Sequence, residues 1–332
     1  MTASNYDANR GILCICQMLL SKGAKPNLKD CEKKTALHYA AEKGTLDICQ
    51  LLISNGSNPN LKDSKNKTAL HYAAEEGKLD ICHLLLSNGA NPHEEDTYYK
   101  KTALHYTAEK GALDICQLLI SNGSNLNLKD SRNKTALHYA TEKGTLDICQ
   151  RLISNGSNLN LKDSRKKTAL HYAAEKGTLD ICQLLISNGS SQNLKDSKSK
   201  TALHYAAEKG KQDICHLLLR NGANLNEKDD CYKKTALHYA AEKGTLDICQ
   251  LLSSNGSNLN LKDSKNKTAL HYAAEKGKQD ICQVLLRSRA KPNLKDWDGE
   301  TALHYAAETC TPCICQQLVS NGANPNLKDS KG

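Results

Sequence analysis

The sequence predicts an all-α protein in which pairs of short helices stack along the chain. The first observation is a repeat, since the string TALHY recurs every 33 residues, with two steps of 34, starting at Thr35, Thr68, Thr102, Thr135, Thr168, Thr201, Thr235, Thr268 and Thr301. A period in this range is typical of stacked repeat arrays. The second observation is that each repeat holds two helix-length segments, followed by a polar stretch rich in Asn, Asp and Lys.

A degenerate copy precedes these nine, because residues 2–6 align with residues 35–39. Since stacked repeats form one elongated body, we expect a single domain over residues 1–332. Its predicted parts are a degenerate first repeat, 1–34, repeats starting at 35, 68, 102, 135, 168, 201, 235 and 268, and a divergent last repeat, 301–332.

The first helix of a repeat is predicted to begin after Thr35, because threonine is a good N-cap and the Ala and Leu that follow favour helix. Gly44 is expected to end it. Thr68 and Gly77 take the same places in the next repeat.

The second helix is expected to be capped by Thr45. Its apolar residues, within 46–53, surround it almost completely, which predicts burial between neighbours. Asn55 and Gly56 are expected to end the helix, and the polar residues 57–67 to form an extended loop.

These motifs resemble the ankyrin repeat, whose usual text is closer to TPLHLAA, G, VVxLLL, GA and VN. The resemblance covers essentially the whole chain, in about ten copies. It implies a curved ankyrin-repeat solenoid of stacked antiparallel helix pairs with projecting β-hairpin-like loops. It also implies that His38 and His71 hydrogen-bond the backbone and the capping threonine and join adjacent loops. We expect looser loop tips where the family has glycine and this chain has Lys33, Lys166 or Ser199, and strain or fraying at Arg289 and Cys310.

Ten of the fifteen cysteines recur at one repeat position. Neighbouring helices pack about 8–10 Å apart, too far for a disulfide, whose Cα atoms lie within about 7 Å. We therefore expect free thiols and a cytoplasmic protein, with the nucleus as an alternative. The apolar segment 11–20 is too short to span a membrane and aligns with the second helix of later repeats, so no membrane association is expected.

No catalytic chemistry is predicted. Every full repeat holds a His, a Cys and an Asp, but a nucleophilic site is normally unique and its thiol accessible. Cys310 and Cys313 form a CxxC motif, yet a structural zinc site commonly needs two such pairs. No Gly-rich phosphate loop, metalloprotease or hydrolase motif is present. We expect no enzyme activity, no cofactor and no metal.

Function is therefore expected at the surface, in a monomer that binds one or more unidentified proteins as a scaffold or adaptor, through its loop tips and concave face. The net charge of +9 comes mainly from lysines that recur at the loop tips, such as Lys62, Lys65, Lys67, Lys129 and Lys134. Nucleic-acid or polyanion binding by this basic ridge is the alternative, although we regard nucleic acid as an unlikely ligand.

The two 34-residue steps predict where a partner binds. Both place their extra residue in a loop and introduce tyrosine there, and aromatic residues are common anchors of protein interfaces. The alternative is neutral drift on exposed loops. The candidate partner-binding residues are His93, Glu94, Glu95, Tyr98, Tyr99, Tyr232 and Trp297. The first three, with Asp96, are expected to form a local acidic patch within the basic ridge.

Overall fold

The computed structural model describes residues 3–330, which form twenty helices and no strand. This confirms the all-α fold class. Contacts group the chain into two compact units, Met1–Ser164 and Arg165–Gly332, each described by itself. The single domain over residues 1–332 stays a prediction.

Each unit contains five consecutive helix pairs. The helices of the first unit are α1 (Ala3–Arg10), α2 (Leu13–Ser21), α3 (Ala36–Lys43), α4 (Leu46–Ser54), α5 (Ala69–Glu75), α6 (Leu79–Ser87), α7 (Ala103–Lys110), α8 (Leu113–Ser121), α9 (Ala136–Lys143) and α10 (Leu146–Ser154). Those of the second unit are α11 (Ala169–Lys176), α12 (Leu179–Ser187), α13 (Ala202–Glu208), α14 (Gln212–Arg220), α15 (Ala236–Lys243), α16 (Leu246–Ser254), α17 (Ala269–Glu275), α18 (Gln279–Arg287), α19 (Ala302–Glu308) and α20 (Pro312–Ser320).

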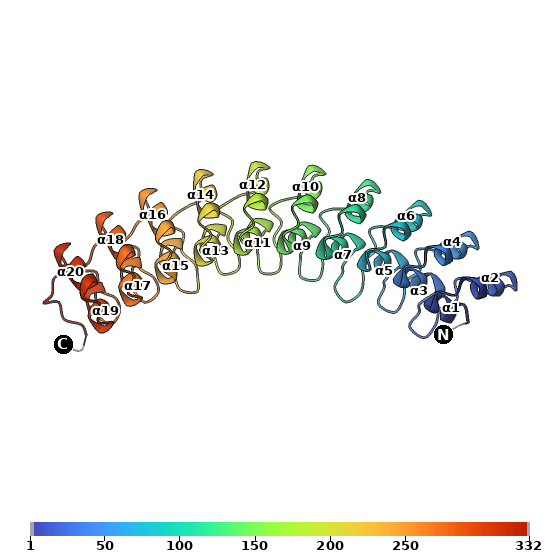
Figure 1. Cartoon of the computed structure of the whole chain (residues 1–332), viewed down its shortest axis with the longest axis horizontal. Coiled ribbons are helices and arrows are strands. Elements are labelled where there is room, and N and C mark those ends of the chain that lie inside the picture. Colours follow the sequence, from blue (N-terminus) through green and yellow to red (C-terminus); the bar gives the residue numbers. More distant parts are fainter. Residues whose placement is uncertain (1–2, 331–332) are drawn as a thin grey trace. The chain divides into compact units, whose positions relative to one another are not determined.

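Within each unit the first helices of successive pairs stack on one another, and so do the second helices (Figure 1). The first helices approach closely because Ala36, Ala40 and Ala41 are small and at most 1% exposed. Leu37 on the first helix of the pair and Leu52 on the second helix are equally buried. The predicted stack of helix pairs is thus confirmed.

A histidine joins each repeat to the next. The backbone N–H of Thr35 donates to Nδ1 of His38 over 3.0 Å, so Nδ1 is an acceptor and the ring hydrogen lies on Nε2. That Nε2–H lies 3.1 Å from the carbonyl oxygen of Lys67, one repeat further on. Thr68 and His71 repeat the arrangement, with Nε2 of His71 3.2 Å from the carbonyl of Lys101. These threonines and histidines thus make the type of hydrogen bonds that the resemblance implies.

The degenerate first repeat keeps this link with a different side chain. Asn5 lies where later repeats have histidine, and its Nδ2 donates to the carbonyl of Lys34 over 3.1 Å. The first repeat is therefore joined to the second by the same type of bond.

The helix ends agree with the sequence only in part. Gly44 ends α3 with φ 82° and Gly77 follows α5 with φ 69°, both left-handed conformations that glycine adopts without strain. The expectation that Thr45 caps α4 is wrong, because its hydroxyl lies 3.3 Å from the carbonyl of Ala40 and makes no capping bond.

The expected burial of the second helix on nearly all sides is also wrong. In α4 only Ile48, Cys49 and Leu52 are buried, whereas Leu46 is 39% exposed. The helix packs on its first helix and on its neighbours along the stack, so its remaining side faces solvent.

The loops end in tight turns rather than strands. In a typical tip the N–H of Asp63 donates to the carbonyl of Lys67, and that of Asn66 to the carbonyl of Asp63. The N–H of Ser64 donates to Glu32 in the preceding tip, which links successive tips. Figure 1 shows the loops projecting on the side of the first helices.

The residues that replace family glycines do adopt left-handed conformations, with φ of 57° at Lys33, 56° at Lys166 and Ser199, 68° at Arg289 and 50° at Cys310. Side chains with a Cβ rarely adopt such angles, and the cost is about 1–2 kcal/mol per residue. The strain predicted at Arg289 and Cys310 is thus present, whereas looser tips at Lys33, Lys166 and Ser199 stay a prediction.

No helix among residues 3–330 has both the length and the apolar character needed to cross a membrane.

We predict that the protein loses stability as the pH falls from 7.5 to 5.5. Burial lowers the pKa of His71, His171 and His238 to about 4, whereas unfolded histidine has a pKa of about 6.5. Below about pH 6.5 the unfolded chain therefore binds protons that the folded chain does not, and each such histidine removes about 1.4 kcal/mol at pH 5.5. The urea midpoint, followed by circular dichroism, should fall accordingly.

The variant His71→Asn is the control, because the first repeat already carries Asn5 at this position. It should be less stable at pH 7.5, and its midpoint should depend less on pH than that of the natural chain. A midpoint that is equal at pH 7.5 and 5.5 would contradict the assignment of neutral, Nε2-protonated histidines.

We also predict that removing buried serine hydroxyls stabilises the chain. Ser57, Ser124 and Ser157 are buried after a second helix, and their hydroxyls have no hydrogen-bond partner within residues 3–330. Ala90 and Ala223 take the same repeat position and are buried equally well. Because an unpaired buried hydroxyl costs about 1–3 kcal/mol, each Ser→Ala change should raise the free energy of unfolding by about 1 kcal/mol.

Urea unfolding of the triple variant Ser57→Ala, Ser124→Ala, Ser157→Ala measures this effect. Ser64→Ala serves as a control, because Ser64 is an exposed tip residue. A triple variant no more stable than this control would show that the hydroxyls are satisfied in solution.

Candidate functional site

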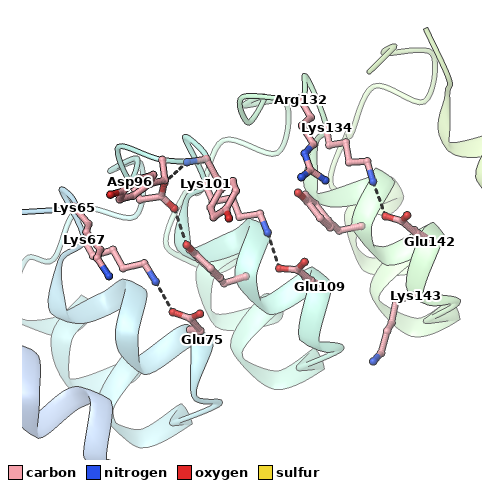
Figure 2. A pocket seen from close by; sticks show the side chains of 14 residues that line it. Lys65, Lys67, Glu75, Asp96, Lys101, Glu109, Arg132, Lys134, Glu142 and Lys143 are labelled. Carbon is pink, nitrogen blue, oxygen red and sulfur yellow. Dashed lines mark hydrogen bonds and ion pairs between the residues drawn. The ribbon is translucent and has the colours of Figure 1, made fainter. Parts of the chain in front are cut away.

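A surface cavity lies in the first unit, between three loop tips and the first helices α5, α7 and α9. It encloses about 820 Å³ and is referred to below as the tyrosine groove (Figure 2). Its lining residues are Lys65, Lys67, Glu75, Asp96, Tyr98, Tyr99, Lys101, Tyr106, Glu109, Arg132, Lys134, Tyr139, Glu142 and Lys143.

The middle tip of the groove is the first of the two lengthened loops. The N–H of Asp96 donates to the carbonyl of Lys101 and closes the turn, as the equivalent bond does in other tips. The residue with left-handed backbone is Lys100, four residues after Asp96, whereas Asn66 lies three residues after Asp63. The carboxylate of Asp96 accepts the N–H of Tyr99 over 2.6 Å, and the carbonyl of Tyr99 accepts the N–H of Ser131 in the next tip. The extra residue therefore widens one turn without breaking the link between tips.

This wider turn leaves two aromatic rings in solvent. Tyr98 is 71% exposed and Tyr99 50% exposed, and their ring centroids lie 6.5 Å apart. The Tyr99 ring also lies 5.5 Å from Nζ of Lys101. The two rings thus form an exposed aromatic rim on one side of the groove.

The floor of the groove is a row of lysine–glutamate pairs, seen side by side in Figure 2. The Nζ–Oε2 distances are 2.5 Å for Lys67 and Glu75, 2.7 Å for Lys101 and Glu109, and 2.6 Å for Lys134 and Glu142. Each lysine follows a loop tip and each glutamate lies eight residues later on the first helix. The six charges cancel in pairs.

Tyrosines of the TALHY motif lie between these lysines. Nζ of Lys101 is 5.2 Å from the ring of Tyr106 and 4.6 Å from that of Tyr139, within the range of a cation–π interaction. The hydroxyl of Tyr106 donates to Asp96 over 2.6 Å. Burial, aided by this bond, holds the pKa of Tyr106 well above its usual value, so the phenol stays protonated. These rings form a rigid wall and already use their hydroxyls.

Three cations of the groove have no such partner. The side chains of Lys65, Arg132 and Lys143 make no ion pair or hydrogen bond within residues 3–330. The remaining carboxylate of the groove, that of Asp96, does not pair with them, because it accepts hydrogen bonds from Tyr99 and Tyr106. After the paired charges cancel, the groove retains positive charge at its edges.

Of the four residues predicted to form an acidic patch, His93 and Glu94 make other contacts. Nδ1 of His93 accepts the N–H of Asn125 in the next loop, in the place of an asparagine in other repeats. Glu94 pairs with Lys62, with 2.5 Å between Nζ and Oε2, and so is neutralised. Glu95 is half-buried and is not part of the groove lining. Of the candidates in this loop, only Tyr98 and Tyr99 line the groove.

The other two aromatic candidates lie in the second unit. Tyr232, in the second lengthened loop, is 57% exposed, and Trp297 is 70% exposed. The tip of Tyr232 is closed like that of Tyr99, with the N–H of Tyr232 donating to Asp229. Both rings are accessible, as a binding anchor requires.

Cysteines offer little nucleophilic chemistry at the repeated position. Burial raises the pKa of Cys49, Cys82 and Cys116 to about 12, so these thiols are protonated at neutral pH. The CxxC residues Cys310 and Cys313 are exposed free thiols.

One group of carboxylates within residues 3–330 has the spacing of metal ligands, with oxygen atoms of Asp296, Asp298 and Glu300 within 4.8 Å of one another. Asp296, however, accepts the N–H groups of Asp298 and Glu300 and the hydroxyl of Tyr305. The corresponding aspartate makes the same bonds in other tips, so forming the turn accounts for its position.

Sequence reasoning missed the lysine–glutamate pairs and the three unpaired cations. The pairs had a visible signal, because Lys and Glu eight residues apart recur in nearly every repeat. The unpaired cations had no visible signal in the sequence. Lys65 and Lys67 are both tip lysines, and only the direction of their side chains decides that Lys67 reaches Glu75 and Lys65 does not.

Comparison with protein families agrees with this architecture. The family model described as ankyrin repeats (3 copies) matches residues 3–96, 88–163, 142–229, 170–263 and 237–329. A comparison with curated proteins found no match. Ankyrin repeats are in general protein–protein interaction modules and are typically not enzymes. From the family match and the stacked helix pairs, we conclude that the chain belongs to the ankyrin-repeat family.

Proposed function

We propose that the protein is a non-enzymatic scaffold or adaptor that binds a protein partner in the tyrosine groove. The observation that carries this proposal is the exposure of Tyr98 and Tyr99 beside an 820 Å³ groove with rigid aromatic walls. Exposed tyrosine next to a preformed concave surface is typical of an interface anchor, because burying the ring gains much apolar contact for little side-chain entropy. Trp297 and Tyr232 are proposed as additional anchors on the second unit.

The charge distribution supports a protein partner more than a polyanion. A phosphate backbone is bound by a row of lysines that can each exchange counterions for phosphate. Lys62 is already paired with Glu94, Lys67 with Glu75 and Lys134 with Glu142. The predicted basic ridge therefore has fewer unpaired lysines than the sequence of its tips suggests.

The proposed location is the cytoplasm, with the nucleus as the alternative. This proposal rests on the repeated cysteine position, where buried thiols are retained as small apolar core residues.

The test is a pull-down from nuclease-treated lysate with the natural chain and with the double variant Tyr98→Ser, Tyr99→Ser. Both side chains are at least half exposed, so the variant should keep the helical circular dichroism of the natural chain. We expect partner proteins captured by the natural chain to fall at least tenfold with the variant, because the aromatic anchors are lost.

Tyr6→Ser is the matched control, since Tyr6 is also 50% exposed but lies on α1, outside the groove. Equal capture by the natural chain and the double variant would show that the groove is not the binding surface. Capture that nuclease treatment abolishes for every variant would favour nucleic acid as the ligand.

A further inference from the structure

We propose that the tyrosine groove binds an extended acidic segment of its partner, with two acidic positions five to six residues apart and an apolar side chain between them. This inference rests on the proposed protein-binding function and specifies the chemistry of the partner. Three features carry it: the unpaired cations, their spacing and the aromatic rim between them.

The sign of the partner's charge follows from which groove residues are already neutralised. The carboxylates of Glu75, Glu109 and Glu142 each pair with a lysine, so they attract no partner cation strongly. Lys65 and Arg132 are exposed and have no acidic partner among the described residues. A carboxylate brought to these side chains gains a charge-assisted hydrogen bond without breaking an existing pair. Basic or neutral segments have no comparable gain.

The spacing of the two acidic positions follows from the stacking. Lys65 and Arg132 occupy equivalent places in tips two repeats apart. Backbone hydrogen bonds hold the three tips in sequence: the N–H of Thr97 donates to the carbonyl of Lys65, and the N–H of Ser131 donates to the carbonyl of Tyr99. Stacked helices lie about 8–10 Å apart, so the two cations are about 16–20 Å apart along the stack. An extended chain rises about 3.3 Å per residue and covers this distance in five to six residues.

The apolar position follows from the rim. The tip between the two cations is the one that carries Tyr98 and Tyr99, which are the exposed rings of the groove. A segment that reaches from Lys65 to Arg132 therefore passes these rings at its middle. An apolar side chain there would bury tyrosine surface that is now in solvent.

The experiment uses fluorescein-labelled peptides that carry a central leucine, one Glu-Glu pair on each side of it, and Gly and Ser at the other positions. Three peptides place the facing glutamates of the two pairs two, six or ten residues apart, and a fourth has Gln for every Glu of the six-residue peptide. Fluorescence anisotropy with the full chain gives each Kd. We expect the six-residue peptide to bind most tightly and the Gln peptide at least tenfold more weakly.

Charge-reversal variants locate the contact. The double variant Lys65→Glu, Arg132→Glu should bind the six-residue peptide at least tenfold more weakly than the natural chain. The control is Lys22→Glu, Lys25→Glu, which has the same net charge and alters two exposed lysines of the first repeat, outside the groove lining. This control should retain the affinity of the natural chain.

Several outcomes would overturn the inference. Equal affinity for the Glu and Gln peptides, equal affinity for the three spacings, or equal losses in both charge-reversal variants would each do so. A labelled single-stranded oligonucleotide that bound more tightly than the peptide, and lost affinity with the Lys65→Glu, Arg132→Glu variant, would assign the cations to nucleic acid.

Failure of the inference is distinguishable from failure of the proposed function. If the tyrosine variant loses its protein partners while the Lys65→Glu, Arg132→Glu variant keeps them, the groove binds protein but does not select acidic segments. If both variants keep all partners, the proposed function itself is wrong.

Discussion

The structure depends on one hydrogen-bonded histidine that recurs along the chain. Its Nδ1 accepts from the threonine that starts its own helix, and its Nε2–H donates to the carbonyl that precedes the next repeat, as in His38 and Lys67. The first of these hydrogen bonds fixes the start of the helix, and the second sets the distance to the next loop. The stack, the row of tips and the groove between tips all follow from it, because each needs consecutive repeats to be held in the same relation.

The sequence predicted the features that many repeats share. Helix starts at Thr35 and Thr68 and the left-handed turn at Gly44 follow from local chemistry that recurs, whereas the histidine links were implied by the resemblance to the ankyrin repeat. It failed where the outcome depends on the direction of a side chain. Thr45 has the residue type of a cap but bonds backwards to Ala40, and the apolar residues of α4 face solvent on one side. These results depend on packing between repeats, which no local pattern records.

The candidate site was predicted in the same uneven way. Tyr98 and Tyr99 were found because they break the copying of the repeat, and they do line the groove. Glu94 looked like part of an acidic patch, yet it is neutralised by Lys62 from the preceding loop. Opposite charges 32 residues apart in sequence give no sign that they will pair. Charge composition therefore overstated both the acidity of this tip and the availability of the lysines around it.

The link between tips has a further consequence for how such a chain changes during evolution. Successive tips share one backbone bond, such as that from the N–H of Ser64 to the carbonyl of Glu32, and this bond does not depend on which side chains stand on either side. Loss or duplication of a whole 33-residue copy by recombination would keep this bond at each junction. The number of repeats can thus vary, while the proposed partner-binding residues are carried by single copies.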